Sequence, residues 1–522
     1  MPNIRSAKGA AMLMLLATAG TNLIATRPAA SAAVTAAPAT DQERAFVADF
    51  EAFLSASLQR LSSIPGVAVA VTRSGGPLLV RGYGRADIER GVPTTPETRF
   101  YIASSTKAFM GLTLALLERR NLVDLDWTLS QLAPDVTFAP ELRAGEVTLR
   151  HLLTHTHGLR NWPIQFRLAF TGEHDAATLW GLLPRLTSNS EAPLGTYAYS
   201  NLGYNLAALL VERRLGRRWQ DLVEAEVLRP LRLSQTLTQG LERARRIHPV
   251  AAPYLGLAPG GPQLLSLLKV DSNMQSAGGI YSSVNDLGRW LTLHLLAAKG
   301  ANGLPLPADV VAATHRPVAT VTGDSGPFAA SGYGLGWGSG PYEGETLFQA
   351  FGGYPGARSH VSFMPARDLG VAIVTNDEGA GAPFIDVAAA YAYDWFVSGR
   401  DAAERRAGAA IDRIAEQGAR ITERIAADRA SRSGRQWQLT LDRAAYAGRF
   451  CNGDFGTIVV TRAGEGFDVT IGAMRSRATP FTEPDAIRAE LMPNQGMALR
   501  FTIENGRAIA LNAFDTSFRR CG

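Results

Sequence analysis

Lysine is scarce in this sequence of 522 residues. Four lysines, Lys8, Lys107, Lys269 and Lys299, stand among 52 basic residues, and the other 48 are arginines. Arginine does not lose its proton in a protein, whereas a buried lysine can. Chemistry that needs a neutral amine therefore has few candidates in this chain.

A strong excess of one charge is also missing. The formal net charge is +5, and three of the basic residues (Arg5, Lys8 and Arg27) precede the first acidic residue, Asp41. Without that segment, 49 basic residues face 47 acidic residues. Nucleic-acid-binding domains carry a larger and clustered positive charge. We therefore expect no nucleic-acid partner.

Long apolar segments are confined to the N-terminus. Residues 10–20 are almost uninterruptedly apolar, Arg5 and Lys8 precede them, and an Ala-x-Ala pattern ends at Ala32. This order is typical of a cleaved secretory signal peptide, and the run is shorter than the ~20 residues that a spanning helix needs. The sequence predicts a signal peptide at 1–32, a periplasmic or secreted protein, and no stable membrane span after cleavage.

Only two cysteines occur, Cys451 and Cys521, and they lie 70 residues apart. In an exported chain they are free to form a disulfide. Such a bond would close a C-terminal module and stabilise it by roughly 4 kcal/mol in the chain-entropy model. Two buried free thiols are the alternative, and the sequence leaves both open.

The remaining sequence has the composition of a globular protein. Hydrophobic residues make up 46% of the chain, and its length suggests two to four domains. Apolar residues recur at helical spacing in 41–62 and 106–122 and form runs of strand type in 67–71, 78–83, 100–102, 334–338 and 361–376. The middle, 145–300, is mostly helical. This order predicts an α+β fold with an antiparallel sheet flanked by helices.

Three segments follow the predicted signal peptide. We expect a main domain at 41–400, a connecting amphipathic helix at 401–436 rich in Ala, Arg and Glu, and a small all-β domain at 437–522. In the last segment the apolar period drops to two, and Glu504-Asn505-Gly506 is typical of a hairpin turn.

One short pattern carries chemistry. Ser104 and Lys107 form an S-x-x-K sequence where a strand runs into the helix 106–122. Positions i and i+3 share one face of a helix, so the amine can reach the hydroxyl. A desolvated lysine is a base that can activate a serine nucleophile. Ser266 and Lys269 repeat the pattern without a preceding strand, and we interpret that match as coincidental.

A second pattern supports the first. Tyr199 and Asn201 lie two residues apart before another apolar helix, where both can face one cavity. A tyrosine whose pKa is lowered by a nearby lysine can carry a proton, and an amide can hold a substrate oxygen. A buried tyrosine beside a helix-capping asparagine is the structural alternative.

These motifs together are similar to those of the serine β-lactamase and penicillin-binding-protein superfamily, in its class C, D-aminopeptidase and carboxylesterase branch. The resemblance runs from about Phe46 to about Asp394, and residues 437–522 resemble a β-barrel appendage of some members. Further segments that carry the resemblance are HLLTHTHGL at 151–159, SAGG at 276–279, YGLGW at 333–337 and GYPG at 353–356.

The resemblance implies roles for four residues. Ser104 would attack a carbonyl, Lys107 and Tyr199 would move its proton to and from the leaving group, and Asn201 would position the substrate. It assigns the histidine pattern H-x3-H-x-H at 151–157 to a structural turn. We expect no metal and no cofactor.

The third motif of the family departs from its pattern. A Lys or His is expected five residues before Pro355, where the chain has Ala350-Phe351-Gly352, or Phe351-Gly352-Gly353 after a one-residue shift. We expect Gly352 and Gly353 to line the site, and the N–H of Gly353, or of Tyr354 in the shifted register, to complete the oxyanion hole with that of Ser104. We also expect Phe351 to form an apolar wall that favours an acyl chain. The alternative is that another cation, Arg358 or His360, takes the place of the missing Lys or His.

The sequence predicts an exported serine hydrolase that acts through an acyl-enzyme on small esters or amides. Esters are favoured because the missing cation normally holds a substrate carboxylate. A D-amino-acid peptidase or amidase, a β-lactamase, and a non-catalytic penicillin-binding-like sensor are the alternatives. The sequence leaves the oligomeric state open.

Overall fold

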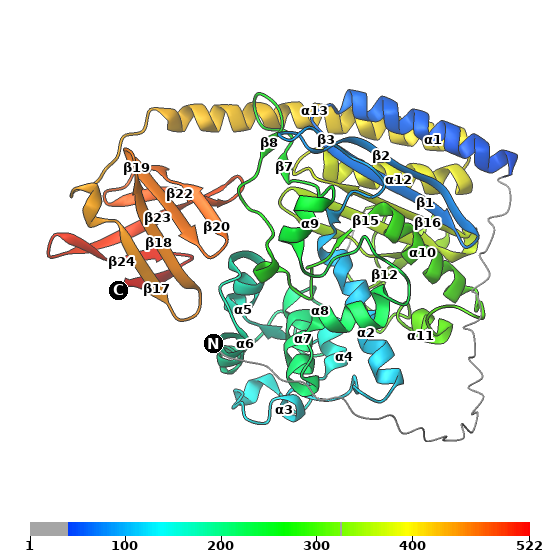
Figure 1. The fold of residues 1–522 in the computed structure, drawn as a ribbon, viewed down its shortest axis with the longest axis horizontal. Coiled ribbons are helices and arrows are strands. Elements are labelled where there is room, and N and C mark those ends of the chain that lie inside the picture. Colours follow the sequence, from blue (N-terminus) through cyan, green and yellow to red (C-terminus); the bar gives the residue numbers. More distant parts are fainter. Residues whose placement is uncertain (1–39, 324–325, 522) are drawn as a thin grey trace, which may run out of the picture. The chain divides into compact units, whose positions relative to one another are not determined.

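Two large sheets dominate the computed structural model, which describes residues 40–323 and 326–521 (Figure 1). All of these residues belong to one unit, Pro38–Gly522. The predicted signal peptide lies outside the described residues. The combination of a large antiparallel sheet with helices and a separate all-β sheet confirms the predicted fold class.

A ten-stranded antiparallel sheet forms the centre of the larger domain. Its order is β10-β11-β12-β13-β15-β16-β1-β2-β3, and β14 pairs with β15 beside this path. The apolar runs 67–71 and 78–83 lie in the paired strands β1 and β2, and the apolar run 361–376 divides into β15 and β16. The strands are β1 (Gly66–Arg73), β2 (Gly76–Asp87), β3 (Val92–Pro93), β10 (Ala319–Thr320), β11 (Gly332–Tyr333), β12 (Gly338–Tyr342), β13 (Glu345–Gln349), β14 (Gly352–Tyr354), β15 (Ala357–Met364) and β16 (Leu369–Thr375).

The prediction of a strand at 334–338 is wrong. This segment is the connection between β11 and β12, and Gly336 turns it with a left-handed φ of 92°. A Cβ at Gly336 would also overlap the backbone of Ala108. The glycine therefore serves a tight turn against a neighbouring helix rather than a strand.

Helices cover both faces of this sheet, which explains why its central strands are apolar on both sides. In β1, Ala68 and Ala70 pack into one core with α2 and α10, whereas Val67 and Val69 pack into a second core with α1 and α12. The helices are α1 (Asp41–Arg60), α2 (Thr106–Arg119), α3 (Leu129–Leu132), α4 (Leu149–Leu153), α5 (Trp162–Phe166), α6 (Ala176–Gly181), α7 (Asn201–Leu215), α8 (Trp219–Val223), α9 (Leu241–Ile247), α10 (Val284–Ala298), α11 (Ala308–Ala313), α12 (Gly381–Val397) and α13 (Arg400–Ser433).

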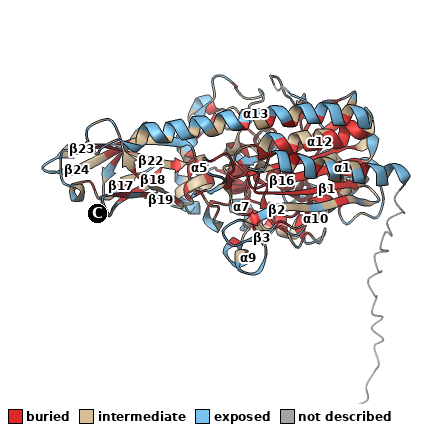
Figure 2. Cartoon of the chain, turned by 90° about the horizontal axis from the view of Figure 1, so that it is seen from above, coloured by how far each residue is buried: buried red, intermediate tan, exposed pale blue. Residues whose placement is uncertain are grey.

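The connecting segment is a single helix of 34 residues, α13. Its small and branched residues Ala403, Ala407, Ile411 and Ile414 are buried in the same core as α12. Figure 2 shows the largely exposed outer face of this helix. Among the described residues, no helix has the length and apolarity required to cross a membrane.

The C-terminal segment folds into a nine-stranded, nearly closed antiparallel sheet. A disulfide joins Cys451 and Cys521, which decides the alternative that the sequence left open. Asn505 and Gly506 adopt left-handed φ values of 51° and 72° in the predicted hairpin turn. The strands are β17 (Gly448–Asn452), β18 (Gly456–Ala463), β19 (Gly466–Ile471), β20 (Met474–Arg477), β21 (Thr479–Pro480), β22 (Ala486–Met492), β23 (Gln495–Glu504), β24 (Arg507–Ala513) and β25 (Thr516–Arg520).

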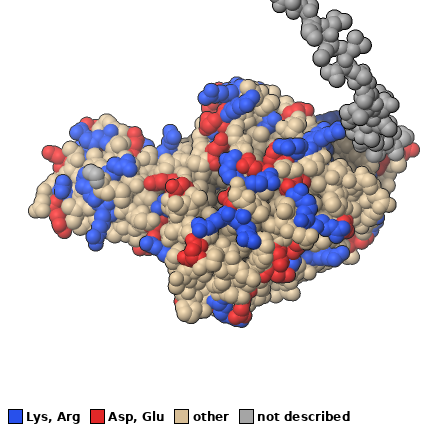
Figure 3. Space-filling model, turned by 60° about the horizontal axis from the view of Figure 1, so that its bottom comes forward, with Lys and Arg blue, Asp and Glu red and all other residues tan. Residues whose placement is uncertain are grey.

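The nine-stranded sheet docks on the segment that follows α5. Arg167 is buried and donates hydrogen bonds to the backbone oxygens of Asp454 (2.6 Å) and Gly453 (3.1 Å). The ring of Phe166 lies 4.8 Å from that of Phe514. The apolar core of the small domain therefore continues into the larger one. On the face drawn in Figure 3, acidic and basic side chains are intermixed.

Candidate active site

Ser104 lies on a tight turn between a strand and a buried helix. It belongs to a 3₁₀ turn (Ala103–Ser105) that joins β4 (Phe100–Tyr101) to α2, and β4 pairs with β9 (Tyr281–Ser282). Ala103 has a left-handed φ of 45°, which a non-glycine residue seldom adopts. Ser104 is the partly exposed residue of the turn, at the N-terminal end of α2. The positive end of the helix dipole faces it there and favours its alkoxide.

Lys107 is buried directly behind Ser104. Its Nζ lies 3.1 Å from Ser104 Oγ, 2.7 Å from Asn201 Oδ1 and 2.8 Å from the backbone oxygen of Ala277. The side chain is 1% exposed, and burial lowers the pKa of Lys107 well below its usual value of 10.5. Burial disfavours the ammonium form because the charge loses its water shell.

Three oxygens surround Nζ. The oxygens of Asn201 and Ala277 can only accept, and each takes one N–H bond from Nζ. Ser104 Oγ is the third neighbour, and a hydroxyl can accept from an ammonium or donate to the lone pair of a neutral amine. In the neutral form that burial favours, the lone pair of Lys107 is available to the Ser104 hydroxyl.

Tyr199 and Asn201 lie next to Ser104 and Lys107 in one site, as the sequence predicted. The Nζ of Lys107 lies 4.7 Å from the centre of the Tyr199 ring, and the Ser104 hydroxyl is near enough to the Tyr199 hydroxyl to lower its pKa. The cap of α7 is Ser200, whose side chain accepts from Leu202 N at 3.1 Å. Asn201 is therefore not the helix cap, and its side chain is free to hold Lys107.

The predicted effect of lysine on the tyrosine pKa is wrong. Although 51% of Tyr199 is exposed, its hydroxyl end is enclosed, and burial raises its pKa to about 12 while the bond to Ser104 opposes this. The neighbouring amine of Lys107 does not offset this increase in the Tyr199 pKa, because burial also favours the uncharged form of the amine. At neutral pH this shift favours the phenol of Tyr199 over the phenolate.

The third motif lies against the nucleophile turn. A Cβ at Gly352 would overlap the backbone oxygen of Ile102, so only glycine allows β14 to approach so closely. Gly353 is exposed next to it, on the same strand. The oxyanion role of the Gly353 N–H stays a prediction.

The side chains around these glycines differ from two expectations. Ala350 packs into the core that contains α2, but Phe351 points to the opposite core, where its ring lies 4.5 Å from that of His360. The expected apolar wall is therefore wrong, because Phe351, in the connection between β13 and β14, packs on the side opposite to Ala350. His360 is fully buried and bonded to Asp386 and Ser362 on that same side, and so it is no substitute cation.

Arg358 is held in place by three acceptors. It donates to the backbone oxygens of Tyr354 (2.7 Å) and Ala357 (3.0 Å) and forms an ion pair with Glu378 at 3.1 Å. Its guanidinium lies beside Gly353, but these bonds would have to break before it could swing toward a substrate.

The second S-x-x-K pattern is not brought together. Ser266 Oγ is directed to the backbone oxygen of Arg475, at 3.4 Å. Lys269 Nζ is buried and donates to the backbone oxygens of Ala169 (2.6 Å) and Asn273 (3.1 Å). No helix follows Ser266 to place its i+3 neighbour on the same face.

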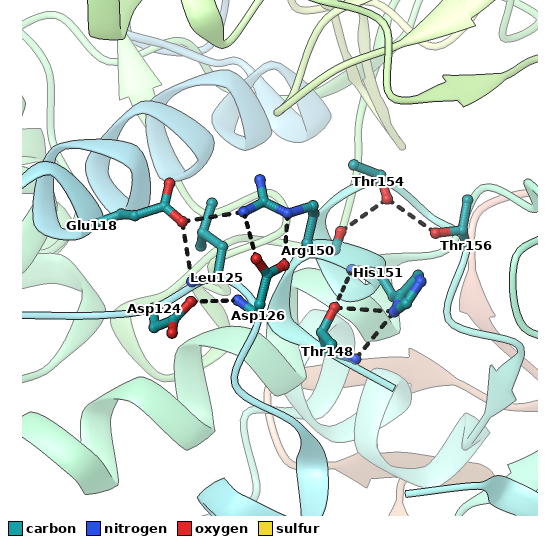
Figure 4. A network of polar contacts seen from close by, with 9 residues as sticks. All are labelled: Glu118, Asp124, Leu125, Asp126, Thr148, Arg150, His151, Thr154 and Thr156. Atoms are coloured by element: carbon teal, nitrogen blue, oxygen red, sulfur yellow. Dashed lines mark hydrogen bonds and ion pairs between the residues drawn. The ribbon is translucent and has the colours of Figure 1, made fainter. Parts of the chain in front are cut away.

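The histidine pattern supports a turn. His151 Nδ1 bonds to Thr148 at the start of α4 (Figure 4), and His157 Nδ1 accepts from Leu159 N at 3.0 Å. Within the described ranges, no three His, Cys, Asp or Glu side chains are grouped to hold a metal ion.

Sequence reasoning missed two contributors to the site. The backbone oxygen of Ala277 accepts from Lys107, and Ser105 Oγ lies 2.6 Å from the oxygen of Ala350 and 2.8 Å from Ser359 Oγ. Ala277 belongs to the SAGG segment at 276–279, but the sequence did not indicate that its backbone oxygen binds Lys107. No local pattern links Ser105 to Ser359, which lies 254 positions later.

The family profile described as Beta-lactamase matches residues 50–403 of this chain. The protein belongs to the Beta-lactamase family. This is a family of serine hydrolases, and the match confirms both the predicted resemblance and its extent along the chain.

The curated relatives include a protein named as a hydrolase. The chain is 30% identical over 340 residues to an unguisins hydrolase of Aspergillus campestris, covering 63% of this chain and 60% of that protein. It is 22% identical over 324 residues to Protein flp of Staphylococcus aureus, covering 60% of each. The chain thus spans about 60% of the length of the curated relatives that it matches.

Solved structures show the same fold. An octameric penicillin-binding protein homologue from Pyrococcus abyssi has a TM-score of 0.57 at 20% identity, covering 90% of this chain and 99% of that one. The D-amino acid amidase from Ochrobactrum anthropi complexed with L-phenylalanine amide has a TM-score of 0.53 at 21% identity, covering 71% of this chain and 99% of that one.

Proposed function

We propose that this member of the Beta-lactamase family hydrolyses small neutral esters or amides through an acyl-enzyme on Ser104, with esters favoured. The observation that carries the proposal is the buried amine of Lys107, whose Nζ lies 3.1 Å from Ser104 Oγ. A nucleophile and a base within hydrogen-bond reach are the requirement of covalent catalysis.

The first half of the reaction transfers the acyl group to the serine. As the bond from Ser104 Oγ to the carbonyl carbon forms, the hydroxyl proton passes to the neutral amine of Lys107. The N–H groups of Ser104 and Gly353 stabilise the negative carbonyl oxygen. The bond to the leaving group then breaks, and Tyr199 supplies the proton that this group needs.

The second half releases the acid. The proton that Lys107 accepted passes to the adjacent Tyr199 oxygen, which restores the phenol and the neutral amine. Water then loses a proton to Lys107 as it attacks the acyl carbon, and the same proton returns to Ser104 Oγ when that oxygen leaves. The residues end in their starting states, so the cycle needs no cofactor.

The preference for neutral substrates follows from Ala350. This side chain faces the core of α2, at the position where the family carries Lys or His, and it offers no charge to a substrate carboxylate. A lost charge-assisted hydrogen bond costs roughly 1.5–3 kcal/mol. Neutral esters and amino-acid amides do not depend on it. The D-amino acid amidase among the proteins of similar fold makes amides the second candidate.

A covalent probe and a substrate panel test this proposal. A fluorophosphonate should label the wild type and the Ser266→Ala variant but not the Ser104→Ala variant. The panel would contain p-nitrophenyl esters, D-aminoacyl amides and a chromogenic cephalosporin. Turnover of the cephalosporin above that of the esters would refute the substrate preference. A wild type without labelling would favour the non-catalytic sensor.

We also propose that the protein is exported to the periplasm or the medium. The N-terminal pattern at 1–32 and the Cys451–Cys521 disulfide support this, since disulfides persist in oxidising compartments. Cell fractionation of the full chain and of a chain lacking 2–32 tests it. Equal retention of both in the cytoplasm would refute export.

A further inference from the structure

His155 contacts the turn that carries the proton donor Tyr199. It follows α4, is 1% exposed, and has a left-handed φ of 60°. Its backbone oxygen accepts from Ala198 N at 2.8 Å, and its Nδ1 accepts from Ser200 N at 3.2 Å. One residue therefore holds the backbone on both sides of Tyr199.

The ring of His155 also packs against the tyrosine itself. The two ring centres lie 4.5 Å apart, and the rings of Tyr204 and Tyr333 lie 5.5 Å and 4.8 Å from that of His155. This cluster encloses the imidazole next to Lys107, whose Nζ lies 5.7 Å from the Tyr204 ring.

The hydrogen bond from Ser200 determines the tautomer. Because Nδ1 accepts a backbone N–H, the single proton of the neutral imidazole must be on Nε2. Burial and the nearby lysine lower the pKa of His155 well below 6.5, so the ring stays neutral. Nε2 has no hydrogen-bond partner among the described residues, so His155 offers no relay for a catalytic proton.

We propose that His155 is a positioning residue for the Tyr199-Ser200-Asn201 turn. It fixes the Tyr199 hydroxyl on Ser104 and the Asn201 oxygen on Lys107, and it takes no part in proton transfer. This inference rests on the proposed function. A displacement of about 1 Å in a catalytic group can lower a rate by roughly 100-fold, so a positioning bond has a measurable effect on kcat.

His157 is a matched control in the same turn. It is 3% exposed, and its Nδ1 also accepts a backbone N–H, that of Leu159. Leu159 belongs to β5 (Leu159–Arg160), which pairs with β6 (Thr187–Ser188) and carries no predicted catalytic residue. Loss of this bond should affect folding in the same way without moving Tyr199.

The experiment compares His155→Ala, His155→Asn, His157→Ala and the wild type on a p-nitrophenyl ester, at a temperature where all are folded by circular dichroism. We expect His155→Ala to lower kcat by roughly 10- to 100-fold with little change in KM. His155→Asn should recover most of kcat, because its Oδ1 replaces Nδ1 and asparagine tolerates left-handed φ. His157→Ala should keep the wild-type kcat.

Three results would overturn the inference. They are a kcat of His155→Ala equal to that of His157→Ala, a loss confined to KM, and no recovery in a folded His155→Asn variant. These results leave an active wild type and so do not affect the proposed function. A wild type that neither hydrolyses the panel nor is labelled refutes the proposed function and this inference with it.

Discussion

Replacement of Lys107 by arginine tests the base directly. Arginine keeps the positive charge and the approximate length but cannot become neutral. The groups that contact Nζ would not balance the charge of a guanidinium. They are the neutral side chains of Ser104 and Asn201 and the backbone oxygen of Ala277. At 1% exposure the larger guanidinium must also displace packed neighbours. Lys107→Arg therefore introduces a permanent charge where the mechanism needs a lone pair.

The expected loss follows from the role of the amine. Removal of a general base lowers a rate by roughly 10²–10⁴, which corresponds to about 3–5 kcal/mol in the activation barrier. Overpacking adds about 1–3 kcal/mol to the cost in folding free energy, and this part affects stability rather than kcat. The kinetic measurement must therefore be made on folded protein.

The assay is kcat/KM on a p-nitrophenyl ester together with the second-order rate of fluorophosphonate labelling. Lys299→Arg is the control, because Lys299 is 42% exposed and pairs with Asp368 at 2.9 Å on the surface. It should keep the wild-type rate. If folded Lys107→Arg kept more than about a tenth of that rate, the assignment of Lys107 as the base would be refuted.

The same amine determines the pH dependence. Because burial lowers the pKa of Lys107, the neutral form is available well below pH 10.5. Activity should rise with pH as the ammonium loses its proton, and fall as acid restores it. A kcat/KM that falls with rising pH through the neutral range would contradict this sign.

Four further predictions follow from single features of the structure. Ala350→His should raise kcat/KM on carboxylate-bearing substrates by roughly 10- to 150-fold relative to neutral esters, and an unchanged ratio would contradict the account of the third motif. Burial lowers the pKa of Lys269 from 10.5 to about 7, so the unfolded chain binds more protons between these values and wild-type stability rises with pH there. Folding of the wild type at low pH must bury a lysine that is protonated in the unfolded chain, at a cost of up to about 5 kcal/mol, and Lys269→Met lacks this cost. The free energy of unfolding of Lys269→Met minus that of the wild type, measured with urea, should therefore decrease from pH 6 to pH 10. Cys451→Ser should lower the calorimetric Tm as reductant does, with about 4 kcal/mol lost in the chain-entropy model. A chain ending at Ser433 should still be labelled by the fluorophosphonate, and a folded but unreactive product would show that the β-domain contributes to the site.

Local features were predictable because they depend on neighbours in the chain. The pair Ser104 and Lys107 needs only the helical spacing of i and i+3, and the hairpin turn at Asn505-Gly506 needs only residues that accept left-handed φ. The central strands were predictable from their apolar runs, since burial on both faces requires them. The domain boundaries and the roles of the site residues stay predictions.

Features that depend on the packing of distant segments were not predictable. Lys107 and Lys269 occupy the same S-x-x-K pattern, but only the first meets its serine, because only Ser104 is followed by a helix. The pKa of Tyr199 moved upward instead of downward, because desolvation by the enclosing segments exceeds the effect of one adjacent amine. The identities and spacing of the catalytic pair are thus local and follow from the sequence. The protonation state of each group is decided by the tertiary structure, because burial sums over residues far apart in the chain.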